Sequence, residues 1–225
     1  MEALERHPED LVDGICKGVT WGDYNNDGRP DLYISRNGQP NLLFRNDGPC
    51  AAMGTATAAE KRKRSGPPWW TFTETATQAG VTEPLWSFPC WFWDYDNDGW
   101  EDLMVLAFDN SQPQLENIAA DYLGLPHQGP LPRLYRNRRD GTFEDVTEPT
   151  GLNKPLLAMG CNFGDLDNDG YLDFYVGTGD PDFRTLIPNR MFRNDRGSRF
   201  QDVTTAGGFG HLQKGHGIAF ADLDN

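Results

Sequence analysis

The chain has 225 residues, with 34 acidic and 20 basic side chains, which gives a formal net charge of −14. Binding to nucleic acids depends on Lys and Arg that displace counterions from phosphates, so this charge argues against a nucleic-acid partner. No stretch approaches the roughly 18 to 20 apolar residues that cross a bilayer, and the first ten residues lack the basic and apolar regions of a secretory signal. We therefore expect neither membrane insertion nor nucleic-acid binding.

A nine-residue pattern, D-x-[DN]-x-D-G-x-x-D, occurs three times and begins a fourth time at the end of the sequence. Gly at the sixth position allows a tight curl of the backbone, so that alternate side chains can converge on one point. The acidic residues at these positions number 13, close to the whole net charge, so the acidity is local. In chain order the pattern residues are Asp23, Asn25, Asp27 and Asp31, then Asp94, Asp96, Asp98 and Asp102, then Asp165, Asp167, Asp169 and Asp173, and finally Asp222 and Asp224.

Carboxylates spaced this closely repel one another unless a cation lies between them. Ligand sets made only of oxygen, without His or Cys, suit a hard ion, and a flexible loop with several carboxylates suits calcium better than magnesium. The alternative is ordinary turn chemistry, because Asp, Asn and Gly favour tight hairpins without any metal. We favour calcium, since all three complete copies keep the ninth-position Asp, for which a turn alone has no use. The sequence thus predicts three complete Ca²⁺ sites and a truncated fourth, with weaker binding where Asn25 replaces Asp.

The pattern resembles the first half of an EF-hand loop but departs from it at position twelve. A bidentate Glu is expected there, and this chain has Ile34, Val105 and Val176 instead. Each loop continues into a run of β-type residues, such as Asp102-Leu103-Met104-Val105. The loops therefore join strands rather than helices. The residue two positions before each loop is always aromatic, which indicates a core strand that enters the loop, at Trp21, Phe92, Phe163 and Phe220.

Two further landmarks recur with each loop: an aromatic-Arg-Asn step, as at residues 44–46, and a later strand centred on Phe. The distance from that Phe to the next loop is 22 residues in all three cases. The shortest complete unit, 57 residues from Asp165 to Asp222, contains four short apolar runs, which is typical of a β-propeller blade. We predict an all-β fold of four-stranded antiparallel blades. The expected repeats are approximately residues 14–80, 81–151, 152–208 and 209–225 (truncated), with insertions at about 49–68 and 110–131. We expect the second insertion to contain one or two helical turns around residues 115–123.

Residues 21–28, 163–170, 43–48 and 141–147 resemble FG-GAP/VCBS repeats, and more narrowly the repeats of the cartilage acidic protein and ASPIC/UnbV group. The resemblance covers roughly residues 14 to 225. It implies a seven-bladed propeller, related to the integrin α-subunit head, with calcium in the loops that connect strands. It places side-chain ligands at the first, third, fifth and ninth positions. Backbone carbonyl ligands would come from the seventh position, which is Arg29, Trp100 and Tyr171.

At this repeat length the chain holds about 3.5 of the seven blades that the resemblance implies, and it ends inside a metal loop without an ASPIC/UnbV-type C-terminal segment. We expect a fragment of a longer protein, with the rest of the propeller missing from the chain. An open half-ring leaves two blade faces uncovered, so the piece alone should be marginally stable or should associate.

Other features have plainer interpretations. Cys90 and Cys161 lie in register four residues before a loop, as small core residues would, whereas a disulfide that involves Cys16 or Cys50 stays open. The basic run at residues 61–64 indicates a solvated loop more than a polyanion site. The His residues form no catalytic pattern, and the Asp pairs are better explained as calcium ligands than as an acid and base.

Our leading hypothesis is a non-enzymatic, calcium-loaded propeller scaffold for protein or glycan recognition or adhesion, in which calcium is structural. The calcium sites and the resemblance favour an extracellular, periplasmic or cell-surface location. The alternative is the propeller portion of a larger secreted enzyme that acts on polysaccharide. A linear calcium array of thrombospondin or dockerin type would have much shorter repeats without aromatic strands.

Overall fold

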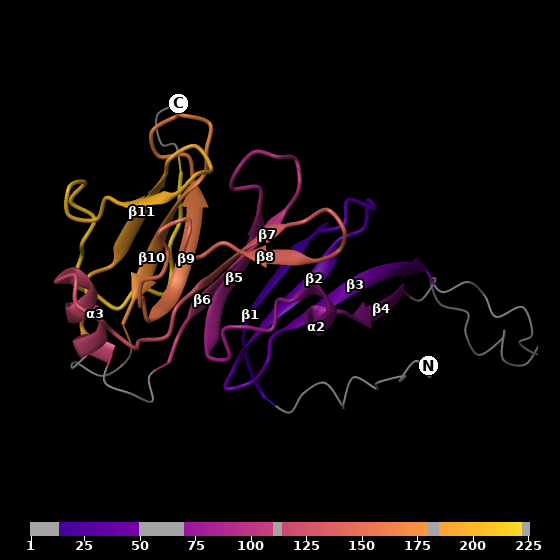
Figure 1. Ribbon diagram of the computed structural model, residues 1–225, viewed down its shortest axis with the longest axis horizontal. Coiled ribbons are helices and arrows are strands. Elements are labelled where there is room, and N and C mark those ends of the chain that lie inside the picture. Colours follow the sequence, from indigo (N-terminus) through magenta and orange to yellow (C-terminus); the bar gives the residue numbers. More distant parts are fainter. Residues whose placement is uncertain (1–13, 50–69, 110–113, 180–184, 222–225) are drawn as a thin grey trace, which may run out of the picture.

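The computed structural model describes residues 14–49, 70–109, 114–179 and 185–221, and its regular structure is almost entirely β-strand (Figure 1). These residues form three four-stranded antiparallel sheets, in each of which the strands lie in chain order. The fold is all-β with propeller-like blades, as the four apolar runs per repeat predicted. The sheets are β1 (Ile15–Gly22), β2 (Asp31–Asn37), β3 (Leu42–Pro49) and β4 (Trp70–Glu74); β5 (Ser87–Trp93), β6 (Asp102–Ala107), β7 (Arg133–Asn137) and β8 (Phe143–Asp145); and β9 (Ala158–Gly164), β10 (Asp173–Thr178), β11 (Arg190–Asn194) and β12 (Phe200–Asp202).

The three acidic loops occupy the same place in the three sheets. Each loop joins the first strand of its sheet to the second, and the residue before the loop pairs with the ninth-position Asp. The pairs are Gly22 with Asp31, Trp93 with Asp102, and Gly164 with Asp173. The loops are thus hairpin connections of fixed register.

The sheets pack face to face, and their first strands lie together, since β1 contacts β5 and β5 contacts β9. Between the first two sheets, Tyr33 and Leu43 of one sheet meet Phe92, Leu103 and Phe143 of the next. A second aromatic core lies between the second and third sheets, where the rings of Trp93 and Phe200 stack with centroids 5.7 Å apart. Full burial of each large side chain contributes about 1.5–3 kcal/mol, so packing between sheets is a main source of stability.

One face of the first sheet has no neighbouring sheet among the described residues. Trp21 and Phe72 occupy the positions that Phe92 and Phe143 occupy in the second sheet, yet they are 56% and 42% exposed against 7% and 6%. The aromatic residue two positions before each loop was expected in the core. That expectation is right for Phe92 and wrong for Trp21, because burial at this position requires a preceding sheet.

Two short helices lie outside the sheets: α2 (Ala76–Ala79) and α3 (Gln114–Tyr122). Helix α2 ends at Gly80, whose φ of 79° is left-handed, and the chain then turns into the next sheet. None of the described helices is long and apolar enough to cross a membrane.

Helix α3 belongs to the second insertion, where we expected one or two helical turns, and it binds the third sheet. Ile118 packs in a small core with Met159 and Ile187. Asp121 accepts hydrogen bonds from the buried Arg190 of β11 at 2.9 and 3.0 Å. The helix therefore connects the second repeat to the third sheet.

The cysteines of the described residues, Cys16, Cys90 and Cys161, are free thiols. Cys16 is exposed, whereas Cys90 and Cys161 are half-buried and pack against the two cores, in line with their register. Four features of the sequence analysis lie outside the described residues: Cys50, the basic run at 61–64, Asp222 and Asp224.

Candidate metal centres

The backbone of each loop curls through left-handed positions. The fourth-position residues Asn26, Asn97 and Asn168 have φ of 53°, 58° and 57°, and Asn is among the few residues with side chains that adopt this conformation readily. The sixth position is Gly in every copy, with φ between 82° and 90°. The sequence thus encodes a tight loop at both positions, and only the Gly had been identified beforehand.

The first-position Asp holds the loop backbone in this conformation through two hydrogen bonds. In the second loop, the N–H groups of Asp98 and Gly99 donate to the two oxygens of Asp94 at 2.9 and 2.8 Å. The same two bonds form on Asp23 in the first loop and on Asp165 in the third. The seventh-position N–H of Trp100 donates to Asp98 at 3.0 Å. Ligation by the carbonyl of this position remains a prediction.

Alternate carboxylates converge in the second and third loops. One oxygen from each of Asp94, Asp96 and Asp98 lies within 4.8 Å of the others, and Asp165, Asp167 and Asp169 form an equivalent group. Burial raises the pKa of Asp96, and its buried Oδ1 has no hydrogen-bond partner. A set of carboxylate oxygens with one buried oxygen unpartnered fits a hard cation such as calcium, which would be held there by the first, third and fifth positions.

The first loop is a weaker candidate. Its third position is Asn25, whose side-chain amide donates to Asp27 at 3.0 Å and whose Oδ1 accepts the Asp27 N–H at 3.2 Å. The side chain of Arg29 also pairs with Asp27. With one carboxylate fewer and Arg29 paired with Asp27, this loop offers a cation less negative charge, and the Asn25 amide already occupies an oxygen of Asp27.

Arginines provide counter-charges that the sequence analysis missed. Arg136 of the aromatic-Arg-Asn step lies 2.8 Å from Asp96 and 3.6 Å from Asp98, and Arg139 lies 2.8 Å from Asp98. In the third loop, Arg193 lies 3.4 Å from Asp167. The recurrence of Arg two strands after each loop was a signal for this contact, because the antiparallel meander returns the third strand beside the loop.

The ninth-position Asp has a use that we did not predict. Asp102 is fully buried and accepts N–H groups from Asn137 of β7 at 2.8 Å and from Tyr95 at 3.3 Å. The third-strand N–H also donates to this position in the other sheets, from Asn46 to Asp31 and from Asn194 to Asp173, at 2.7 Å in both. The premise that a metal-free turn has no use for this carboxylate is wrong, because the carboxylate joins the loop to the third strand.

Burial is the main cause of the raised pKa of these carboxyls, and the neighbouring loop acids raise it further. The pKa is raised to about 8 for Asp102 and to about 6 for Asp31, and it is also raised for Asp173. A cation beside these groups would favour their charged form.

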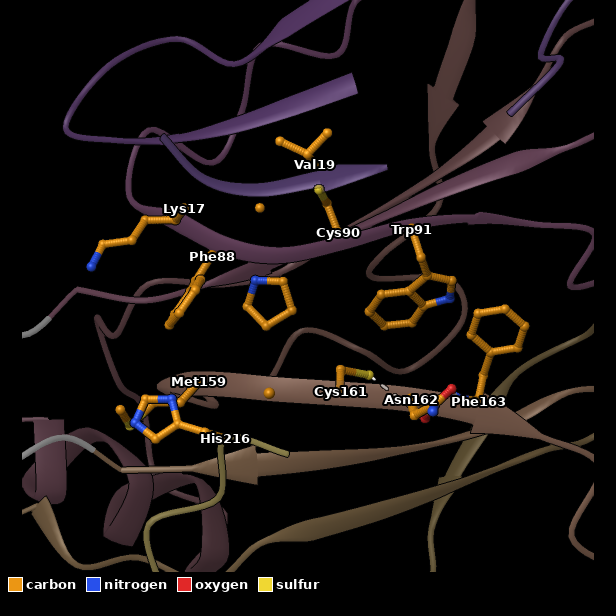
Figure 2. Close-up of a pocket in the computed structure, with 13 residues that line it drawn as sticks. Lys17, Val19, Phe88, Cys90, Trp91, Met159, Cys161, Asn162, Phe163 and His216 are labelled. Carbon is orange, nitrogen blue, oxygen red and sulfur yellow. Dashed lines mark hydrogen bonds between the residues drawn. The ribbon is translucent and has the colours of Figure 1, made fainter. Parts of the chain in front are cut away.

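The first strands of the three sheets line a separate cavity of about 250 Å³. Figure 2 shows Phe88 and Trp91 of β5 facing Met159 and Cys161 of β9, with His216 at the edge. Burial raises the pKa of the Cys90 thiol to about 12 and that of Cys161 well above its usual range. Both thiols stay protonated at neutral pH, which makes them poor nucleophiles.

Residues 94–176 match the family model of the FG-GAP-like repeat. The chain contains an FG-GAP-like repeat. The match begins at Asp94, the first residue of the second loop, and ends in β10, just after the third loop, so it spans both acidic clusters. No curated protein matches the chain.

Proposed function

We propose that this chain is a calcium-binding propeller scaffold of the cartilage acidic protein and ASPIC/UnbV type, which acts outside the cell in recognition of a protein or glycan. The observation that carries the proposal is the convergence of three carboxylates within 4.8 Å at the same hairpin of two successive sheets. The FG-GAP-like repeat spans both hairpins, and such repeats are generally non-catalytic scaffolds.

Calcium would have a structural role in this proposal. Each ion would neutralise one acidic cluster and hold the hairpin between the first two strands of a sheet. Extracellular calcium modules typically bind at ~10⁻⁴ to 10⁻³ M, so sites of this kind fill outside the cell and stay largely empty in the cytosol. The ion would also displace Arg136 and Arg139, which contact the same carboxylates of the second loop.

A calcium titration followed by thermal melting and Trp fluorescence tests this proposal. We expect a melting temperature that rises and saturates with calcium, a weak response to magnesium, and reversal by a chelator. Asp98→Asn should shift the titration to higher calcium. The matched control is Glu148→Gln, which removes an exposed carboxylate outside the loops and should leave the midpoint unchanged. If calcium leaves the melting temperature unchanged, the loops are acidic turns and not structural calcium sites.

A further inference from the structure

Asparagines outside the ligand positions connect each acidic loop to the next. The fourth-position Asn26 of the first loop donates its side-chain amide to the carbonyl of Gly99 in the second loop at 3.2 Å. Asn97 of the second loop donates in the same way to Gly170 of the third loop at 2.9 Å. Both acceptors are sixth-position glycines, so each bond fixes the peptide that precedes the seventh position of the neighbouring loop.

A second set of bonds runs in the opposite direction along the chain. Asn137 gives its backbone N–H to Asp102 of the second loop and its side-chain amide to the carbonyl of Tyr24 in the first loop, at 2.8 and 2.7 Å. Asn194 makes the equivalent pair to Asp173 and to Tyr95 of the second loop, at 2.7 and 2.8 Å. Both asparagines are buried, 4% and 1% exposed, so water does not compete well for these bonds.

Two kinds of hydrogen bond therefore join neighbouring loops: one comes from the fourth-position Asn of a loop, and the other comes from the Asn of the third strand. When one loop becomes ordered, the groups with which it hydrogen-bonds to the next loop become ordered as well. An ion that binds an ordered loop avoids part of the entropy cost of ordering it, which is the physical basis of positive cooperativity between sites.

We infer that neighbouring loops bind calcium cooperatively, with Asn26, Asn97, Asn137 and Asn194 as the positioning residues that transmit the coupling. This inference rests on the proposed function, because it assigns the coupling to the same cation sites. It extends that function from three separate sites to a connected series.

The chain carries its own controls for both kinds of bond. Asn168, the fourth-position residue of the third loop, makes no bond to another loop within the described residues. Asn46, the counterpart of Asn137 in the first sheet, gives its side-chain amide to Pro30 of its own repeat at 3.0 Å. Substitution of these two residues removes the same chemical groups and breaks no inter-loop bond of the described residues.

Nuclear magnetic resonance can follow each loop separately through the amides of Gly28, Gly99 and Gly170. Each of these N–H groups donates to the first-position Asp of its loop, at 2.7, 2.8 and 2.9 Å. Calcium is titrated into the full chain, and a binding curve is recorded for each glycine. We expect cooperative curves with a Hill coefficient greater than one for the unmodified chain.

Two comparisons decide the inference. Asn26→Gly with Asn97→Gly keeps the left-handed backbone and removes the links between loops, so each curve should become independent. Disabling the second loop with Asp94→Asn and Asp98→Asn should raise the calcium midpoint at Gly28 and Gly170 by about 5-fold or more in the chain that keeps both asparagines. The increase should be much smaller in the chain that lacks them.

Asn137→Ala should weaken the coupling between the first two loops, whereas Asn46→Ala and Asn168→Gly should leave it intact.

The outcomes separate the inference from the proposed function. Calcium-dependent shifts with independent curves in every variant would overturn the coupling and leave the calcium sites standing. Equal losses in the control variants and in the link variants would also overturn it. If the amide signals of all three glycines stay unchanged on addition of calcium, both the calcium sites and the coupling are overturned.

Discussion

The first and second sheets place similar residues in different surroundings. Phe92 and Phe143 of the second sheet are buried against the first sheet, whereas their counterparts Trp21 and Phe72 are about half-exposed. Trp21 and Phe72 contact each other edge to face with centroids 6.4 Å apart, so their geometry is ordered even without a covering sheet. A single sheet thus forms its own backbone hydrogen bonds, but the burial of its aromatic side chains depends on a neighbouring sheet.

The largest expected difference between the two sheets is in core truncation. Phe143→Ala should lower the free energy of unfolding by about 3–5 kcal/mol, because it empties a buried aromatic site. Phe72→Ala should lower it by less than about 1 kcal/mol, since that ring already contacts water. Urea unfolding of both variants measures the difference. Equal losses would mean that the exposed face is covered in solution.

The next effect concerns the carboxylate that joins the loop to the third strand. In the presence of a chelator, Asp102→Ala should lower the free energy of unfolding by about 1–3 kcal/mol, because it leaves the buried Asn137 N–H without an acceptor. Asp98→Ala should cost less, because relief of repulsion within the acidic cluster offsets the loss of its bonds with Trp100 and Arg139. Equal destabilisation by both changes in urea would contradict this division between a bonding role and a cation-binding role.

A pH dependence distinguishes the two sheets without altering their packing. Without calcium, the folded-state pKa is about 8 for Asp102 and about 6 for Asp31, above the usual unfolded value of about 3.9. The folded state then binds more protons than the unfolded state below these values, so stability should rise as pH falls from 8 toward 4. Asp102→Asn should flatten the dependence between pH 6 and 8, and Asp31→Asn should change it mainly below about pH 6. Urea unfolding with a chelator at several pH values tests this sign.

The smallest perturbation is thiol labelling, which compares the first strands of the two sheets. Cys16 of β1 is exposed, whereas Cys90 of β5 is protected and has a raised pKa. A thiol reagent should modify Cys16 rapidly in the folded chain and Cys90 only after unfolding. Mass spectrometry of the digested protein assigns the sites, and early modification of Cys90 would argue against the packing of β5 beside β1.

Features that are defined within a single repeat could be predicted from the sequence. The four apolar runs, the position of the acidic loops between strands and the short helix near residues 115–123 all follow from patterns within one repeat. Contacts between repeats were not predictable in this way. Asn137 and Tyr24 are 113 residues apart, and no local pattern shows that the amide of one binds the carbonyl of the other. The exposure of Trp21 was unpredictable for the same reason. Its aromatic side chain indicates a core residue, but only the packing of one sheet on another determines whether it is covered.

The anchoring of α3 has a mechanical consequence. The helix leaves the second sheet after β6 and is held to β11 of the third sheet by the ion pair between Asp121 and Arg190 and by the ring of Tyr122, 4.5 Å from the Arg190 guanidinium carbon. The first two sheets are joined instead by hydrogen bonds of Ser35, Arg36 and Asn41 with residues 84–88. Under a pulling force, we expect the third sheet to separate from the second only after the helix loses its contacts with Arg190.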